Sequence, residues 1–144
     1  MKNIRSLILA IITIAAISSC KKDEIKAPEF LKFELGYDNS GTASVGDELH
    51  IDAEIIAEGK IATIQVKIHP ESEHGANKTS NGWEFDSIYT VGYAGVKNID
   101  FHEHMDIPAD TEPGDYHFHM SVTDQEGNRT VKEAELLIQL PVLK

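Results

Sequence analysis

The stretch Tyr116-His117-Phe118-His119-Met120-Ser121-Val122 (YHFHMSV, 116–122) alternates between apolar and polar residues at every step. Successive side chains of a β-strand point to opposite faces, so this period of two predicts a strand with one buried and one polar face. An amphipathic helix would repeat its apolar residues every three or four positions instead. The methionine falls on the buried face, whereas His117 and His119 share the polar face.

The same alternation recurs from Phe30 to the end of the chain, broken by short turns rich in Gly, Pro, Asn and Asp. No segment shows a sustained helical repeat. Strands are expected at 30–35, 49–55, 63–69, 83–88, 101–107, 116–122 and 131–140. About seven short strands in a chain of this length predict an all-β fold, an antiparallel β-sandwich.

Two motifs sharpen this prediction. Pro113-Gly114-Asp115-Tyr116, followed by Val122-Thr123-Asp124 and Gly127-Asn128, resembles the penultimate strand and last hairpin of bacterial immunoglobulin-like (Ig-like) domains. Taken whole, the chain resembles a group of uncharacterised Bacteroidota lipoproteins with one Ig-like domain and a histidine-rich second half. The resemblance implies an Ig-like sandwich over 29–144, with Tyr116 as its tyrosine corner. It implies no activity, because sandwiches of this type host unrelated functions.

The first twenty residues have the pattern of a secretory signal. A basic start is followed by the apolar run 7–17, which is too short to span a bilayer, and by Ile17-Ser18-Ser19-Cys20. The sequence ISSC resembles the lipobox of bacterial lipoproteins. The expectation is therefore a signal peptide over 1–19, a lipidated Cys20 and a tether over 20–28. The protein would then be anchored in the cell envelope, in the outer membrane, facing the periplasm or the cell surface.

The mature chain would be strongly acidic and form one domain. Two of the thirteen Lys and Arg residues and no acid lie in 1–19, so eleven basic and 24 acidic side chains remain, a net charge of −13. Such a charge repels nucleic acid and attracts cations. Cys20 is the only cysteine, which excludes a disulfide within the chain.

Strand parity places the histidines. His102 and His104 share a face, as do His117 and His119, and the following Met105 and Met120 point to the core. If the strands pair as in Ig-like domains, the second with the fifth and the third with the sixth, two outward triplets form at one end of the domain. These triplets are His50, His102 and His104, and His69, His117 and His119. The seventh histidine, His74, follows His69 in a loop.

Three imidazoles from adjacent strands can bind Zn²⁺ or Cu²⁺. Acidic residues beside the first triplet could complete the shell or orient a ring: Asp52, Glu54, Asp100 and Asp106. Alternatively, the fifth and sixth strands form one hairpin, and their four histidines make a single site. Outward histidines can also be merely solvated or hydrogen-bonded across the sheet.

The leading hypothesis is a lipid-anchored, non-catalytic protein that holds Zn²⁺ or Cu²⁺. The alternative is a structural or adhesive Ig-like module that binds a glycan or an envelope protein. Haem capture by paired histidines is a third option, but no apolar pocket is evident around the pairs. No catalytic motif such as G-x-S-x-G or H-E-x-x-H occurs in the sequence, and no enzyme activity is expected.

Overall fold

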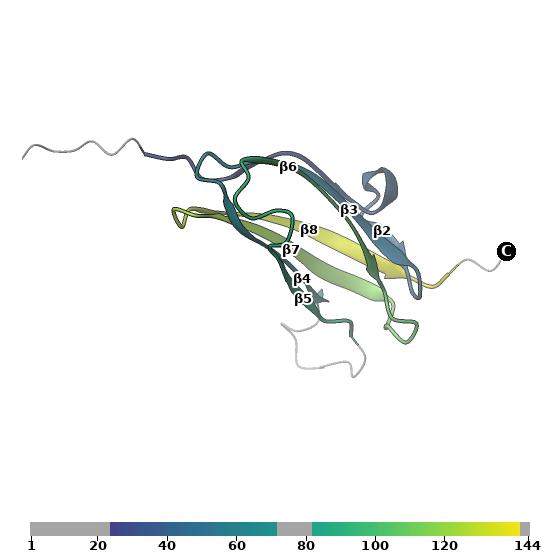
Figure 1. The fold of residues 1–144 in the computed structure, drawn as a ribbon. Helices are drawn as coiled ribbons and strands as arrows, with labels where there is room; N and C mark the ends of the chain where they lie inside the picture. The colour runs from purple at the N-terminus through teal and green to yellow at the C-terminus, as the bar shows by residue number, and fades with distance from the viewer. Residues whose placement is uncertain (1–23, 72–81, 142–144) are drawn as a thin grey trace, which may run out of the picture.

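A computed structural model describes residues 24–71 and 82–141, and within them the chain is all-β (Figure 1). Its eight strands are β1 (Glu29–Leu35), β2 (Thr42–Ser44), β3 (Glu48–Ile56), β4 (Ile61–Pro70), β5 (Phe85–Tyr89), β6 (Asn98–Asp106), β7 (Gly114–Asp124) and β8 (Arg129–Gln139). A 3₁₀ turn, η2 (Tyr37–Asn39), lies between β1 and β2. The predicted all-β class is confirmed.

The strands form two sheets that enclose one core. The three-stranded sheet has the order β1-β3-β6, and the five-stranded sheet has the order β2-β8-β7-β4-β5. The pairs β3–β6 and β4–β7 are antiparallel, as predicted. Because β6 and β7 lie in different sheets, they form no hairpin. The alternative of a single site made by their four histidines is therefore wrong.

The core takes its side chains from the inward faces of both sheets. Its largest fully buried members are Leu35, Leu49, Ile51, Ile55, Ile61, Ile64, Ile68, Phe101, Tyr116, Phe118, Met120 and Leu136. Met105 is buried with them. The predicted inward direction of both methionines is therefore confirmed, and the histidines beside them lie on the outer faces.

Two expectations about short strands need correction. The loop expected between Gly36 and Gly46 contains β2, an edge strand that pairs in parallel with the end of β8. The strand expected at 83–88 starts only at Phe85, and Ile88 is largely exposed. Trp83 precedes this strand but is buried in the core. A ring of that size can cover the end of a core from a loop, without a place in the strand.

Glu103 falls on the inward side of β6, which a period of two would reserve for an apolar residue. Its carboxylate accepts a hydrogen bond of 2.7 Å from the Tyr93 hydroxyl, and the Tyr93 ring packs on Phe101. Burial, then the nearby carboxylate, raises the pKa of Tyr93 strongly. The tyrosine thus stays protonated and keeps this half-buried acid paired.

The chain enters the domain beside the turn between β7 and β8. Asn128 Nδ2 donates to the Ile25 carbonyl at 3.2 Å, and Thr130 Oγ1 donates to the Pro28 carbonyl. The end of the segment expected to be a tether therefore lies against the domain. No helix of the described residues is long and apolar enough to cross a membrane. The expected signal peptide, Cys20 and His74 lie outside these residues.

Candidate functional site

The strand register brings three histidines together on the outer face of the three-stranded sheet. His50, near the start of β3, lies directly opposite His104 on β6, and Asp52 lies opposite His102. The centroids of the three imidazole rings are 5.0 to 5.1 Å apart. Each ring offers a nitrogen within 4.8 Å of the other two. We call these residues the sheet A cluster.

The nitrogens of the sheet A cluster have a spacing that suits ligands of one ion. His102 Nε2 and His104 Nε2 are 3.3 Å apart. Two ligands about 2.0–2.1 Å from a tetrahedral Zn²⁺ are themselves about 3.3–3.4 Å apart. A direct N–H hydrogen bond is usually about 2.7–3.2 Å long. The separation therefore fits two ligands of a shared cation and lies at the long end for a hydrogen bond between the rings.

Carboxylates hold the opposite side of both rings. His102 Nδ1 lies 3.3 Å from Asp52 Oδ2, and His104 Nδ1 lies 3.3 Å from Glu48 Oε2. Burial would raise the pKa of Asp52, but hydrogen bonds to His102 and to Lys32 outweigh it and lower that pKa. An ionised carboxylate beside Nδ1 accepts a hydrogen bond from the Nδ1 proton. This leaves Nε2 unprotonated and orients the ring so that Nε2 can bind a metal.

His50 lies on the outer face as predicted, but it is only 8% exposed. The Tyr37 ring stacks on it, with centroids 5.0 Å apart and planes 7° apart. His50 Nε2 is 3.7 Å from Glu34 Oε1, while its Nδ1 is buried without a hydrogen-bond partner in the described structure. A buried polar atom without a partner costs about 1–3 kcal/mol. A bound cation is one way to satisfy it.

A tight turn places Tyr37 over His50. The Gly36 amide donates to the His50 carbonyl at 2.8 Å, which ties the turn to β3. Gly36 has a φ of 72°, and a Cβ there would meet the Thr42 carbonyl oxygen at 2.7 Å. Only glycine fits this position. Asn39 closes the turn by accepting from the Leu35 amide through Oδ1 at 3.2 Å.

The five-stranded sheet carries a second pair of rings with the same construction. His69 Nε2 on β4 and His119 Nε2 on β7 are 3.2 Å apart, and the rings are stacked with centroids 5.3 Å apart. His69 Nδ1 lies 3.2 Å from the Pro70 carbonyl, and His119 Nδ1 lies 3.3 Å from Glu133 Oε1. We call His69, His117 and His119 the sheet B histidines.

His117 differs from the other two sheet B histidines. It lies directly opposite His69 in the register, yet its ring centroid is 6.3 Å from that of His119. Its candidate ligand atom falls in another group, within 4.8 Å of oxygens of Glu71 and Glu135. The second triplet was expected to resemble the first. The structure instead gives it one Nε2–Nε2 pair, whereas His117, with its ring 5.4 Å from that of His69, has its candidate ligand atom among carboxylates.

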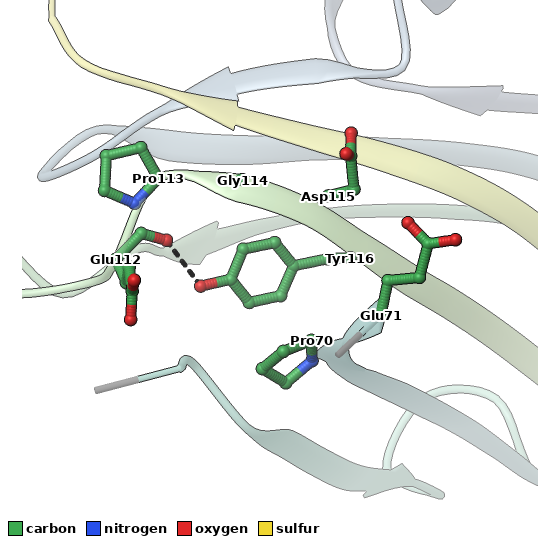
Figure 2. Close-up of a pocket in the computed structure, with 7 residues that line it drawn as sticks. All are labelled: Pro70, Glu71, Glu112, Pro113, Gly114, Asp115 and Tyr116. Carbon is green, nitrogen blue, oxygen red and sulfur yellow. Dashed lines mark hydrogen bonds between the residues drawn. The ribbon is translucent and has the colours of Figure 1, made fainter. Parts of the chain in front are cut away.

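A pocket of about 380 Å³ opens at the end of β4 and the start of β7, beside Tyr116 (Figure 2). Its lining includes the acids Glu71, Glu112 and Asp115. The Tyr116 hydroxyl donates to the Glu112 carbonyl at 2.6 Å, as Figure 2 shows, and accepts from the Trp83 amide at 3.3 Å. The Tyr116 hydroxyl therefore bonds to the backbone four residues upstream, just before the start of β7.

The family of the chain is shown by a match over residues 18–139 to the domain of unknown function DUF4625. The chain belongs to the DUF4625 family. No curated protein matches its sequence. Family membership identifies the protein without assigning an activity.

Two solved structures are similar to this DUF4625 chain. One is Spo0M, a sporulation control protein from Bacillus subtilis, with a TM-score of 0.52 and 11% identity over 81% of this chain and 51% of that one. The other is a DUF4466 family protein from Parabacteroides merdae, with a TM-score of 0.47 and 18% identity over 78% and 44%. The chain spans about half the length of these structures. At 11% identity, the similarity to Spo0M shows a shared fold and nothing about function.

Several residues around the DUF4625 histidines were not expected from the sequence. Of the four acids proposed beside the first triplet, only Asp52 is seen in contact with a histidine of the triplet, His102. Glu54 and Asp100 pair with each other two residues further along the two strands, and Asp106 lies opposite Glu48. The missed residues are Glu34, Tyr37, Glu48, Glu71, Glu133 and Glu135. Glu133 and Glu135 could have been found from the sequence. They are spaced two residues apart on one strand, as His117 and His119 are on the neighbouring strand, and they face those histidines across the sheet. No sequence signal indicated Tyr37, since its position over His50 depends on the conformation of a turn.

Proposed function

We propose that this DUF4625 protein is a lipid-anchored, non-catalytic protein of the cell envelope that binds Zn²⁺ or Cu²⁺ through its histidines. The sheet A cluster is the main support. It combines two Nε2 atoms 3.3 Å apart with the buried His50, whose Nδ1 has no partner among the described residues. Borderline divalent ions prefer imidazole ligands of this kind.

The surroundings of the sheet A cluster favour a cation over three merely polar rings. Glu34, Glu48 and Asp52 place three carboxylates within 3.7 Å of its nitrogens. Solvated surface histidines need no such partners. Carboxylates behind the rings raise ligand basicity and fix ring orientation, which are the usual tasks of groups one shell beyond a metal.

An Ig-like form of the sandwich belongs to the same proposal. The antiparallel pairs β3–β6 and β4–β7 join strands of one sheet each, as in Ig-like domains. The hydrogen bond from Tyr116 to the Glu112 carbonyl supports the same arrangement, because a tyrosine corner bonds to backbone a few residues upstream.

A lipid on Cys20 would present the histidines away from the membrane. Glu29, the first residue of β1, lies opposite Ile56 at the end of β3, whereas His50 lies near the start of β3. The six steps between Ile56 and His50 correspond to about 20 Å of strand. The cluster would therefore face the medium or a partner, which suits acquisition, buffering or delivery of a metal.

The test is metal binding by the chain from Lys21 onward, purified without a chelator and with any histidine tag removed. Elemental analysis should find Zn or Cu, and micromolar Zn²⁺ or Cu²⁺ should raise the melting temperature. At a free metal concentration of 100 Kd the stabilisation is about 2.7 kcal/mol. Mg²⁺ is the control, because imidazole binds it poorly.

A variant that lacks two ligands, His102→Ala/His104→Ala, should lose most of this shift while it keeps its fold in the absence of metal. Both side chains lie on the outer face. No shift of the wild-type protein with either transition metal would contradict the proposal. The adhesive module, with a glycan or protein partner, would then be the better hypothesis.

A further inference from the structure

We propose that Glu71, His117 and Glu135 form a second divalent-cation site on the five-stranded sheet, of an oxygen-rich class that accepts Mn²⁺ as well as Zn²⁺. The site goes beyond the proposed function. It shares no residue with the sheet A cluster, and its donors are one imidazole and two carboxylates. The remaining sheet B histidines, His69 and His119, direct their Nε2 atoms at each other.

Three neighbouring segments bring these side chains together. Glu71 follows directly after β4, His117 lies near the start of β7, and Glu135 lies opposite His117 on β8. One candidate ligand atom from each residue lies within 4.8 Å of the other two. Glu71 and Glu135 are exposed and His117 is half-buried. Small rotations of the two glutamates can therefore tighten the group around an ion without disturbing the core.

The distance between His117 and Glu135 is too long for a strong hydrogen bond and is compatible with two ligands of one ion. His117 Nδ1 and Glu135 Oε1 are 3.5 Å apart. A charge-assisted N–H···O bond is about 2.7–2.9 Å long. Two ligands about 2.1 Å from one ion are about 3.0–3.4 Å apart, depending on its geometry. The observed spacing lies just above that range, and a small rotation of the exposed Glu135 side chain would bring it within it.

The donor set and the adjacent pocket indicate which ions fit. Carboxylate oxygen and water are preferred by Mn²⁺, whereas an all-imidazole site favours Zn²⁺ and Cu²⁺ over Mn²⁺. Glu71 also lines the pocket of about 380 Å³, together with Glu112 and Asp115 (Figure 2). The pocket leaves room for water ligands, and its acids attract cations. Mn²⁺ therefore distinguishes this site from the sheet A cluster.

Mn²⁺ binding by the chain from Lys21 onward tests the site. The electron paramagnetic resonance signal of free aqueous Mn²⁺ is followed in a titration of the wild-type protein and of Glu71→Gln and Glu135→Gln. Both substitutions keep the side-chain shape and lie on exposed residues. The matched control is Glu133→Gln, which changes an acid two residues away on the same strand that faces His119 instead. A second control, His102→Ala, removes a ligand of the sheet A cluster.

We expect the wild-type protein to bind Mn²⁺, and either Glu71→Gln or Glu135→Gln to weaken binding at least tenfold, with both controls within twofold of wild type. Absence of Mn²⁺ binding overturns the proposal. An equal loss in Glu133→Gln overturns it too, because a diffuse acidic surface would then hold the ion, and so does loss in His102→Ala. If Zn²⁺ and Cu²⁺ fail at the sheet A cluster while Mn²⁺ binding depends on Glu71, the proposed function fails and this site stands.

Discussion

The sheet A cluster and the sheet B histidines start from the same strand pattern but surround themselves with different groups. In both, a His-x-His strand runs beside a strand that carries one more histidine. On the three-stranded sheet, β1 and η2 add Glu34 and Tyr37, which cover His50. On the five-stranded sheet, β8 adds two glutamates, one of which lies beside His117. The neighbouring elements therefore decide whether a third imidazole joins the pair.

The difference has an energetic side. His50 is held in place by burial and by a stacked ring, so little side-chain entropy remains to be lost when a metal binds. The glutamate beside His117, Glu135, is exposed, so its side chain must still be ordered when a metal binds. The sheet A cluster, with three preorganised imidazoles, should therefore bind Zn²⁺ more tightly than the sheet B histidines, where only two imidazoles direct their Nε2 atoms at each other. The following predictions test this ranking.

The largest expected effect is loss of a ligand from the preorganised site. His104→Ala should lower the affinity of the tightest Zn²⁺ site by more than about 100-fold, beyond the 10–100-fold that an outer-shell partner usually contributes. His119→Ala should leave that tightest site unchanged within about 0.5 kcal/mol, because it lies on the other sheet. Isothermal titration of both variants with Zn²⁺ measures the two effects.

Double variants test whether the two clusters are separate sites. His50→Ala added to His104→Ala should cost little more, because the site is already broken, whereas His119→Ala added to His104→Ala should act additively within about 0.5 kcal/mol. Strong coupling between His104 and His119 would show that the two sheets contribute to one site. The comparison of two separate clusters would then be wrong.

The next effect in size concerns the carboxylate behind His102. Asp52→Asn keeps the shape of the side chain but removes its charge, so Zn²⁺ affinity should fall by about tenfold, the lower end of the usual range for such partners. Glu54→Gln is the matched control, because Glu54 lies on the same strand and faces Asp100. An equal loss in both variants would point to general electrostatic attraction and not to positioning of His102.

The lowered pKa of Asp52 adds a pH dependence without metal. Its folded carboxyl releases its proton at a lower pH than in the unfolded chain. The contribution to stability is therefore present above the unfolded pKa and is lost as pH falls through the lower folded pKa. Urea unfolding should show wild type to be more stable than Asp52→Asn at neutral pH and the difference to vanish in acid. A difference that persists in acid would contradict an ionic origin.

A smaller effect is expected from the ring that covers His50. Stacked aromatic pairs contribute about 0.5–1.5 kcal/mol beyond their buried area. Tyr37→Ala should therefore weaken Zn²⁺ binding by at most about tenfold, while Tyr37→Phe keeps the stacked ring and the affinity. Competition with a chromophoric Zn²⁺ chelator can resolve such a change. A clear loss in Tyr37→Phe would instead give the hydroxyl a direct role.

The sequence predicts the directions of the histidines better than their surroundings. A period of two fixes which face each residue of β6 and β7 occupies, so the outward position of His102 and the inward position of Met105 followed from parity alone. Pairing of β3 with β6 was predicted by assuming the strand order of an Ig-like domain. The resulting contact between His50 and His104 is a matter of register and could be foreseen.

The turn and the edges could not be foreseen in the same way. Tyr37 reaches His50 only because Gly36, Asp38 and Asn39 all adopt positive φ, with values of 72°, 55° and 54°. Such a turn is one of several that the local sequence allows. The role of Glu71 depends on how the chain leaves β4, which alternation does not specify. The position of Glu135 opposite His117 could have been predicted from the alternation of side chains, once β8 is placed beside β7.

The smallest expected effect comes from the methionines that follow each His-x-His pair. Met105 and Met120 are 4% and 0% exposed and pack in the core, on the faces opposite to their neighbouring histidines. Met105→Leu and Met120→Leu should leave Zn²⁺ affinity unchanged and shift the free energy of unfolding by less than about 1.5 kcal/mol, as for other swaps of similar volume. Chemical unfolding and metal titration of the same samples measure both quantities. The contrast with His104→Ala is instructive, because one step along β6 separates a residue that faces the proposed ion from one that faces the core. A loss of Zn²⁺ affinity in Met105→Leu at unchanged stability would mean that the thioether reaches the metal. The register of β6 against β3 would then be wrong by one residue, since a one-residue slip sends every side chain of a strand to the other face.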